Sequence, residues 1–284
     1  ASALSVVVLG DESGYTAGQN QKMKIAAIEA MWQTEPAPAS FTLFGLPDLA
    51  AHKTNYEIKI PWVLGLIATR TADQPVPGIQ ELVADARVRI VSGLKAYKTL
   101  MQVRAHPKNE ALRTQLDEHV GDLGYALLLK KFRPDIENAT PDDIARAAAS
   151  TIPDVPVLFW SFRIMVAIGF WFIALFAVAF WFSAIRKIDN YKWFLWAAIL
   201  TFPLPWVAIE LGWIVAEYGR QPWAVVGVLP TALGVSSTSA SNVAASIIGF
   251  VTFYSALLVA DIYLLQKFIR LGPEDAIDAP ENAT

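Results

Sequence analysis

The sequence lacks cysteine altogether and is poor in charged residues. Without thiols the chain cannot form disulfides, iron–sulfur clusters or thiolate zinc sites. Charged residues make up 17% of the 284 positions, whereas soluble domains average about 25%. The net charge of −3 gives no reason to expect a nucleic acid as partner. With hydrophobic residues at 54%, the composition indicates an integral membrane protein.

Three segments are long and apolar enough to span a bilayer, which takes about 20 apolar residues. They cover residues 164–185, 193–216 and 243–266. The first ten residues, ASALSVVVLG, are too few to span, and we expect them to be the tail of a fourth helix. The sequence therefore predicts an all-α integral membrane protein with three full transmembrane helices and the end of another.

Basic residues in the short connections predict the orientation, because Lys and Arg favour the cytoplasmic side. The 185–192 connection holds three basic residues and two more follow the third span, whereas the 218–242 connection has only Arg220. We therefore expect the 185–192 loop and the C-terminus to face the cytoplasm. The 218–242 loop and the large segment 11–155 then face outward.

The outward segment is too long for an ordinary loop. Residues 78–103 and 108–132 have helical apolar spacing. Thr140, Pro141 and Asp143 form the N-terminal pattern of a further helix. The proline-rich stretch 34–48 predicts irregular structure. We expect a small helical extramembrane domain.

Ionisable residues within a span are costly in lipid and are therefore candidates for function. Glu210 and Glu217 lie seven positions apart, on one face of a helix, with Trp213 between them. Such carboxylates could carry protons or ligate a metal. The alternative for Glu217 is an interfacial pair with Arg220 three positions on. For Asp261 in the third span, within two turns of Lys267, an interfacial position is the favoured interpretation.

Arg163 and Met165 lie near the outer end of the first span, at the depth expected for Glu217 and Arg220 in the second. Methionine in an apolar helix usually fills space, but it can also ligate haem opposite a histidine. The three histidines all lie in the outer segment. Lys24 and Glu29 also lie there, and an ordinary amphipathic helix would explain them.

Several stretches resemble subunit I of cytochrome bd-type quinol oxidases, and the run GRQPW in the context AEYGRQPW is highly specific to that family. The resemblance covers the whole chain but only the C-terminal part of the family's subunit, and the long outer loop is similar to the long quinol-loop subtype. The matching stretches are GDESGY (10–15), KIAAIEAMWQTEPAPASFTLFGLPD (24–48), LGLIATRT (64–71), FRIMVAIGF (162–170), PLPWVAIELGWIVAEYGRQPW (203–223) and LPTA (229–232).

The resemblance implies a terminal respiratory oxidase that oxidises quinol at the outer face. Electrons then pass through a low-spin haem b, a high-spin haem b and haem d and reduce O2 to water, which generates a proton-motive force without pumping. Lys24 and Glu29 match the loop positions implicated in quinol binding and oxidation. A carboxylate can accept a quinol proton, and a lysine can stabilise a developing quinolate.

The resemblance also gives haem-binding roles to residues of the spans. Met165 matches the methionine ligand of the low-spin haem b iron, and Arg163 matches the arginine beside that haem. Glu217 matches the glutamate ligand of the high-spin haem b iron. Trp213 matches a tryptophan packed beside the haems, and Arg220 matches an arginine near the haem propionates. Glu210 and Asp261 receive no role.

These inferences predict a multi-pass protein of the bacterial cytoplasmic (inner) membrane with residues 11–155 on the periplasmic side. The predicted division is a helix tail at 1–10, a quinol-binding loop domain at 11–155, transmembrane helices at 156–186, 191–217 and 242–268, an outer loop at 218–241 and a cytoplasmic tail at 269–284.

The family's histidine ligands belong to helices that this chain lacks. We therefore expect activity only in an assembly with the remainder of subunit I, subunit II and small accessory subunits, in membrane lipid, with ubiquinol or menaquinol and O2 as substrates. Some relatives carry haem b in place of haem d. Two alternatives are an ion or proton transporter that uses Glu210, Glu217 and Asp261, and a haem-free quinone-binding anchor for another enzyme.

Overall fold

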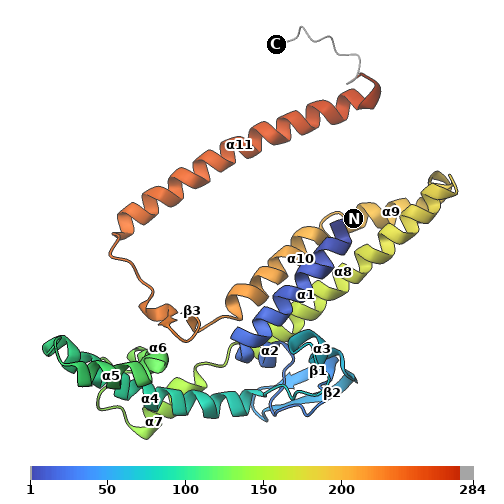
Figure 1. Cartoon of the computed structure of the whole chain (residues 1–284). Coiled ribbons are helices and arrows are strands. Elements are labelled where there is room, and N and C mark those ends of the chain that lie inside the picture. The colour runs from blue at the N-terminus through green and yellow to red at the C-terminus, as the bar shows by residue number, and fades with distance from the viewer. Residues whose placement is uncertain (1, 276–284) are drawn as a thin grey trace. The chain divides into compact units, whose positions relative to one another are not determined.

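The computed structural model describes residues 2–275, which belong to two units, residues 1–234 and residues 235–284 (Figure 1). The second unit contains α11 (Ala240–Asp275). The helices of the first unit are α1 (Ser2–Asn20), α2 (Lys22–Ile28), α3 (Val63–Ala68), α4 (Ile79–Ala105), α5 (Glu110–His119), α6 (Leu123–Leu127), α7 (Pro141–Ala149), α8 (Val155–Ala184), α9 (Lys192–Thr201) and α10 (Leu204–Trp213).

Shorter elements join these helices. One-turn 3₁₀ helices are η1 (Val120–Asp122), η2 (Leu128–Lys131), η3 (Ile188–Asn190) and η5 (Thr231–Leu233), and a π-helical turn, η4 (Ile214–Tyr218), follows α10. Two antiparallel hairpins are formed by β1 (Phe41–Asp48) with β2 (Lys53–Ile60) and by β3 (Trp223–Val225) with β4 (Leu229–Pro230).

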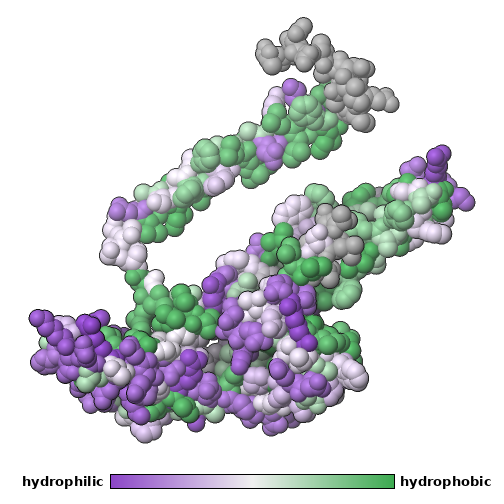
Figure 2. Space-filling view, in the orientation of Figure 1, coloured by the Kyte–Doolittle hydropathy of each residue, from purple (hydrophilic) through white to green (hydrophobic). Residues whose placement is uncertain are grey.

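Three helical segments of the described residues are long and apolar enough to cross a membrane: Val155–Ala184, Lys192–Tyr218 and Ala240–Leu271. They coincide with the three predicted spans, and hydrophobic residues cover their surfaces (Figure 2). The predicted helical membrane fold is confirmed. The third helix continues to Asp275, beyond the predicted boundary at 268, and residues 276–284 of the predicted tail lie outside the described residues.

The second span is not one continuous α-helix. Pro203 and Pro205 lack amide hydrogens, so the α-helix stops after Thr201 and restarts at Leu204. The Thr201 hydroxyl donates to the Ala197 carbonyl at 2.8 Å and accepts from the indole nitrogen of Trp171 at 2.9 Å. These bonds tie the interrupted turn to α8.

The first helix extends further than the sequence predicts. It does not end at residue 10 but continues through polar residues to Asn20. Arg70, just after α3, forms ion pairs with Asp11, at 3.3 Å, and with Glu12. Its guanidinium also lies 4.2 Å from the ring centroid of Tyr15. This arginine therefore holds the polar half of α1.

Residues 34–48 were expected to be irregular, and from Phe41 onward that expectation is wrong. Pro36 and Pro38 keep the first part out of a strand. Beyond them β1 pairs with β2, from Phe41 opposite Ile60 to Asp48 opposite Lys53. The Asp48 carboxylate accepts the amides of the turn residues Ala50 and Ala51, each at 3.0 Å, and so stabilises the hairpin.

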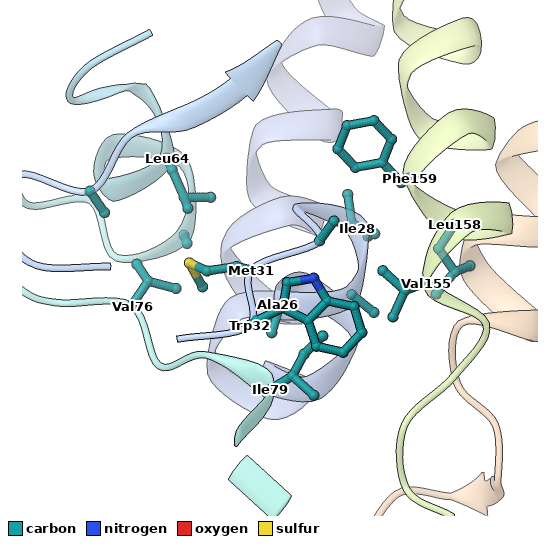
Figure 3. Close-up of a cluster of buried hydrophobic side chains, with 14 residues drawn as sticks. Ala26, Ile28, Met31, Trp32, Leu64, Val76, Ile79, Val155, Leu158 and Phe159 are labelled. Carbon is teal, nitrogen blue, oxygen red and sulfur yellow. The ribbon is translucent and has the colours of Figure 1, made fainter. Parts of the chain in front are cut away.

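Two hydrophobic cores organise the first unit, and α4 runs between them. The first surrounds α2 and includes Trp32, Leu64, Ile79, Leu158 and Phe159 (Figure 3). The second joins α4 to α6, η2 and α7. The predicted cap of α7 is confirmed, because the Thr140 hydroxyl accepts the Asp143 amide while the Asp143 carboxylate accepts the Thr140 amide.

Candidate functional site

Helix α2 is buried against the N-terminal part of α8 and against η4. Ala26 and Ala27 have no exposed surface, and Ile28 packs in the same core as Leu158 and Phe159 of α8. The small alanine side chains let the helix backbone approach α8 closely. Lys24 and Glu29, at opposite ends of this helix, are themselves almost fully buried, at 9% and 3% exposure.

Glu29 is held by one backbone group and one cation. Its Oε2 atom accepts the Thr42 amide at 2.9 Å and lies 3.3 Å from Nη2 of Arg163 on α8. Burial raises the pKa of Glu29 to about 7, while the Arg163 guanidinium and the Thr42 amide limit the rise. The carboxyl group therefore exchanges protons close to neutral pH.

Arg163 is a second buried charge in this cluster. Its Nη1 donates to the carbonyls of Ile28, at 2.7 Å, and Phe159, at 3.1 Å, and Nη2 donates to the carbonyl of Thr42. The guanidinium lies 3.4 Å from the ring centroid of Phe159. Among the described residues its Nε has no hydrogen-bond partner. The arginine thus joins α8 to both α2 and β1.

Lys24 points to the other span. Its Nζ donates to the Ala216 carbonyl in η4 at 2.9 Å, where carbonyls at a helix end lack partners within the helix. Burial lowers the pKa of Lys24, Arg220 lowers it further, and Glu217 opposes both. A Cβ atom on Gly219 would lie 3.2 Å from Cγ of Lys24 and from a methyl group of Leu158, so glycine gives the lysine its space.

Glu217 and Arg220 form the ion pair expected from their spacing, and both side chains are partly exposed. The backbone around Glu217 is a π turn, not the α-helix that the sequence suggested. A π turn winds more slowly than an α-helix, so the seven-residue spacing alone no longer fixes the angle between Glu210 and Glu217. Glu210 is exposed, as is Trp213, at 62%.

Met165 lies half-buried on the face of α8 that meets α10. A Cβ atom on Gly212 of α10 would lie 3.2 Å from the Met165 sulfur. The thioether therefore reaches the junction of the two spans at a place where α10 has no side chain.

The structure sorts the predicted residues into two groups. In the first group Glu29 lies beside Arg163 of α8. In the second group Lys24, bonded to the Ala216 carbonyl of η4, lies near Glu217 and Arg220. Helix α2 carries one member of each group and separates them. Asp261 is exposed on α11 in the second unit.

Sequence reasoning missed three residues of the site. Thr42 contributes only its backbone, which no side-chain pattern can indicate. Gly212 and Gly219 act by leaving room, and a glycine inside an apolar span was the available signal for such a close approach.

A cavity of about 260 Å³ adjoins the Lys24 group. Its polar lining includes Gln21, Lys24, Arg89, Tyr125 and Arg220. Among the described residues the side-chain oxygen of Gln21 is buried without a hydrogen-bond partner. Glu29 does not line this cavity, so the two ends of α2 meet different surroundings.

Comparison with known proteins gives consistent matches. A family model described as cytochrome bd terminal oxidase subunit I matches residues 1–273. Over 270 residues the chain is 38% identical to cytochrome bd-II ubiquinol oxidase subunit 1 of Escherichia coli (strain K12), which covers 95% of the chain and 52% of that protein. It is 29% identical to cytochrome bd ubiquinol oxidase subunit 1 of Bacillus subtilis (strain 168), over 90% of the chain and 43% of that protein. The chain thus spans about half the length of these relatives.

Proposed function

Because the chain belongs to the cytochrome bd terminal oxidase subunit I family, we propose that it forms the quinol-oxidising part of a terminal respiratory oxidase that reduces O2 to water. The observation that carries this proposal is the buried pair of Glu29 and Arg163, which links α2 of the outer segment to the span α8. Such a pair places a proton acceptor at the boundary between the outer segment and the membrane.

Glu29 is the proton acceptor in this proposal. Quinol loses two protons as it gives up two electrons, and a base works best when its pKa lies near the working pH. Burial raises the pKa of Glu29 to about 7, which suits this task. Arg163 and the Thr42 amide fix the orientation of the carboxylate.

Lys24 is the electrostatic partner for the substrate. A buried cation beside a quinol oxygen stabilises the negative charge that develops as the proton leaves. Its hydrogen bond to the Ala216 carbonyl holds the ammonium group beside η4. The two residues lie toward opposite ends of α2, Lys24 at the cavity and Glu29 beside Arg163.

The residues of the spans fit haem. The Met165 thioether lies opposite Gly212 of α10, in a space that a Cβ atom would narrow, and a thioether is a known axial ligand. We assign it to a low-spin haem b. The Glu217 carboxylate is assigned to a high-spin haem b, since its ion pair with Arg220 uses Oε2 and leaves Oε1 outside that pair. When bound, these haems and haem d accept electrons from quinol and deliver them to O2.

Other residues position these groups. Arg220 pairs with the carboxylate of Glu217 and also lines the cavity beside Lys24, where its guanidinium would hold a haem propionate. The exposed indole of Trp213 offers a flat surface for packing against a haem. Arg163 precedes Met165 by two residues on α8, and we assign it as the arginine beside the haem that Met165 would ligate.

The remaining parts of the assembly follow from the family. We propose a bacterial inner membrane complex with residues 11–155 on the periplasmic side, completed by the remainder of subunit I, subunit II and small accessory subunits. Ubiquinol or menaquinol supplies the electrons. Protons released outside and taken up inside make a proton-motive force without pumping. The transporter alternative is not favoured, because Glu217 is paired with Arg220 and Glu210 is exposed.

The first test is spectroscopic. Dithionite-reduced minus air-oxidised spectra of the purified complex would be compared for wild type, Met165→Leu and the control Met101→Leu, whose methionine lies on α4. We expect the low-spin b component to be lost only in Met165→Leu. Haem bands that are unchanged in that variant would reject the methionine assignment, and a complex without haem bands would reject the oxidase proposal.

A second test addresses quinol. Glu29→Gln keeps the shape of the side chain but cannot accept a proton, so kcat/KM for quinol should fall at least about 100-fold while the haem spectrum stays. The control is Glu57→Gln in the hairpin. An unchanged kcat/KM in Glu29→Gln would reject the role of this carboxylate.

A further inference from the structure

The hairpin of β1 and β2 has two chemically different faces. On one face Lys59 forms ion pairs with Glu35, at 3.0 Å, and Glu57, at 3.4 Å. On the other face Phe44 stands opposite Ile58, and Phe41 stands opposite Ile60. A register shift between Thr42 and Phe44 brings both phenylalanines to this apolar face.

The apolar face is exposed in this chain. Ile58 is 57% exposed, and Trp62, just beyond β2, is 58% exposed. Leu43, Leu46 and Leu66 nearby are each about half exposed. Soluble surfaces rarely show so many large apolar side chains together, and such a patch marks contact with protein or membrane.

The position of the hairpin on α8 favours membrane. The ring of Phe44 packs edge-on against Trp160, with centroids 5.6 Å apart, and Phe41 packs against Phe162 at 6.4 Å. Helix α8 has 30 residues and is therefore about 45 Å long, whereas the hydrocarbon core is about 30 Å thick. Arg186 and Lys187 mark its inner end, so Trp160 and Phe162 fall in the outer interfacial layer.

We propose that the apolar face of this hairpin, including Ile58, Ile60 and Trp62, lies in the outer interfacial layer of the bilayer and contacts lipid. The face adjoins Trp160 and Phe162 of α8, and its aromatic side chains are of the kind that settles at the depth of the interfacial layer. Lys53 at the start of β2 is exposed and can extend its ammonium group toward lipid phosphates. The proposal depends on the membrane placement of α8 and not on the redox activity.

The absence of cysteine makes a direct test convenient, since Ile58→Cys brings the only thiol of this chain. The variant would carry a nitroxide label in the full complex, reconstituted in nanodiscs of phosphatidylethanolamine and phosphatidylglycerol, with the labelled wild-type complex as background. Power-saturation EPR would compare collisions with O2, which concentrates in lipid, and with a water-soluble nickel chelate. The matched control is Glu57→Cys, its neighbour on the polar face.

We expect the Ile58 label to collide mainly with O2 and the Glu57 label mainly with nickel. Nickel collisions dominating at both positions would place the face in water and reject the proposal. An Ile58 label reached by neither reagent would mean that protein covers the face, which also rejects it. Ile60→Cys, on the same face, carries the same test if Ile58→Cys does not assemble.

Discussion

Replacing Arg163 by glutamine should raise the pKa of Glu29. The two charges lie 3.3 Å apart, and at an effective dielectric constant of about 20 their attraction is about 5 kcal/mol. One pKa unit corresponds to about 1.4 kcal/mol. Loss of the cation disfavours the ionised carboxylate, so the pKa moves upward from its value of about 7. Because a neutral glutamine still donates a hydrogen bond and water can enter, we expect a rise of about one to two units.

The measurement is a pH titration by infrared spectroscopy. A protonated carboxyl group has a C=O stretching band that is absent from a carboxylate, and Glu29→Gln identifies the band by removing it. In Arg163→Gln the midpoint of this band should move to higher pH, and the pH profile of quinol oxidation should follow it. Arg163→Lys retains the cation and should stay near the wild-type midpoint.

A matched control is Arg70→Gln, which removes an exposed arginine whose ion pairs lie at α1. It should leave the midpoint unchanged. A midpoint in Arg163→Gln that stays at about 7, or moves to lower pH, would refute the reasoning that this cation holds the carboxylate in its ionised form.

Three further predictions concern stability. The pKa of Glu29 is raised by folding, so the folded state loses about 3 kcal/mol of stability as pH rises from about 4.5 to above 7. The Tm of the purified complex should therefore fall less over this pH range in Glu29→Gln than in wild type. An equal fall of Tm with pH in the two proteins would contradict this prediction. Gly219→Ala should lower the free energy of unfolding by about 1–3 kcal/mol and raise the KM for quinol, because the new Cβ would lie 2.5 Å from the Val215 carbonyl oxygen and 3.2 Å from Cγ of Lys24. The control is Gly169→Ala, where a Cβ would have no atom within 4 Å. Equal decreases in Tm for the two variants would count against the close approach at Gly219. Thr140→Ala should lower the free energy of unfolding by about 1 kcal/mol and speed proteolysis near α7. The control Thr114→Ala on α5 should leave the rate of this cleavage unchanged, and identical cleavage rates in the two variants would argue against the cap.

Much of the fold follows directly from hydrophobic length. A count of apolar residues was enough to predict the spans at α8 and α11. Three residue types in the right order were enough to predict the cap of α7. The hairpin of β1 and β2 was missed because its proline-rich approach hides a strand that begins at Phe41. The end of α1 was missed because it depends on Arg70, about 60 positions later in the chain, and pairwise contacts at that separation leave no local pattern.

In the site, too, some features could be predicted from local sequence and others depend on contacts between distant residues. Glu217 and Arg220 were expected as a pair from their spacing, and the pair forms, but the π turn around them required tertiary structure. The partnership of Glu29 with Arg163 joins residues 134 positions apart. Each could be singled out as an unusual charge, yet which of the five charges in the site would meet which depended on how α2 packs between the spans.

The placement of α2 has a consequence for how the outer segment tolerates damage. One end of this short helix is fastened to α8 through Glu29 and the other to η4 through Lys24. A break in the exposed turn between α4 and α5 would therefore free a distant part of the segment without releasing α2. Because α2 is attached to both spans, a chain cut at that turn should keep α2 in place. A change in the distance between the two spans would instead strain both attachments of α2.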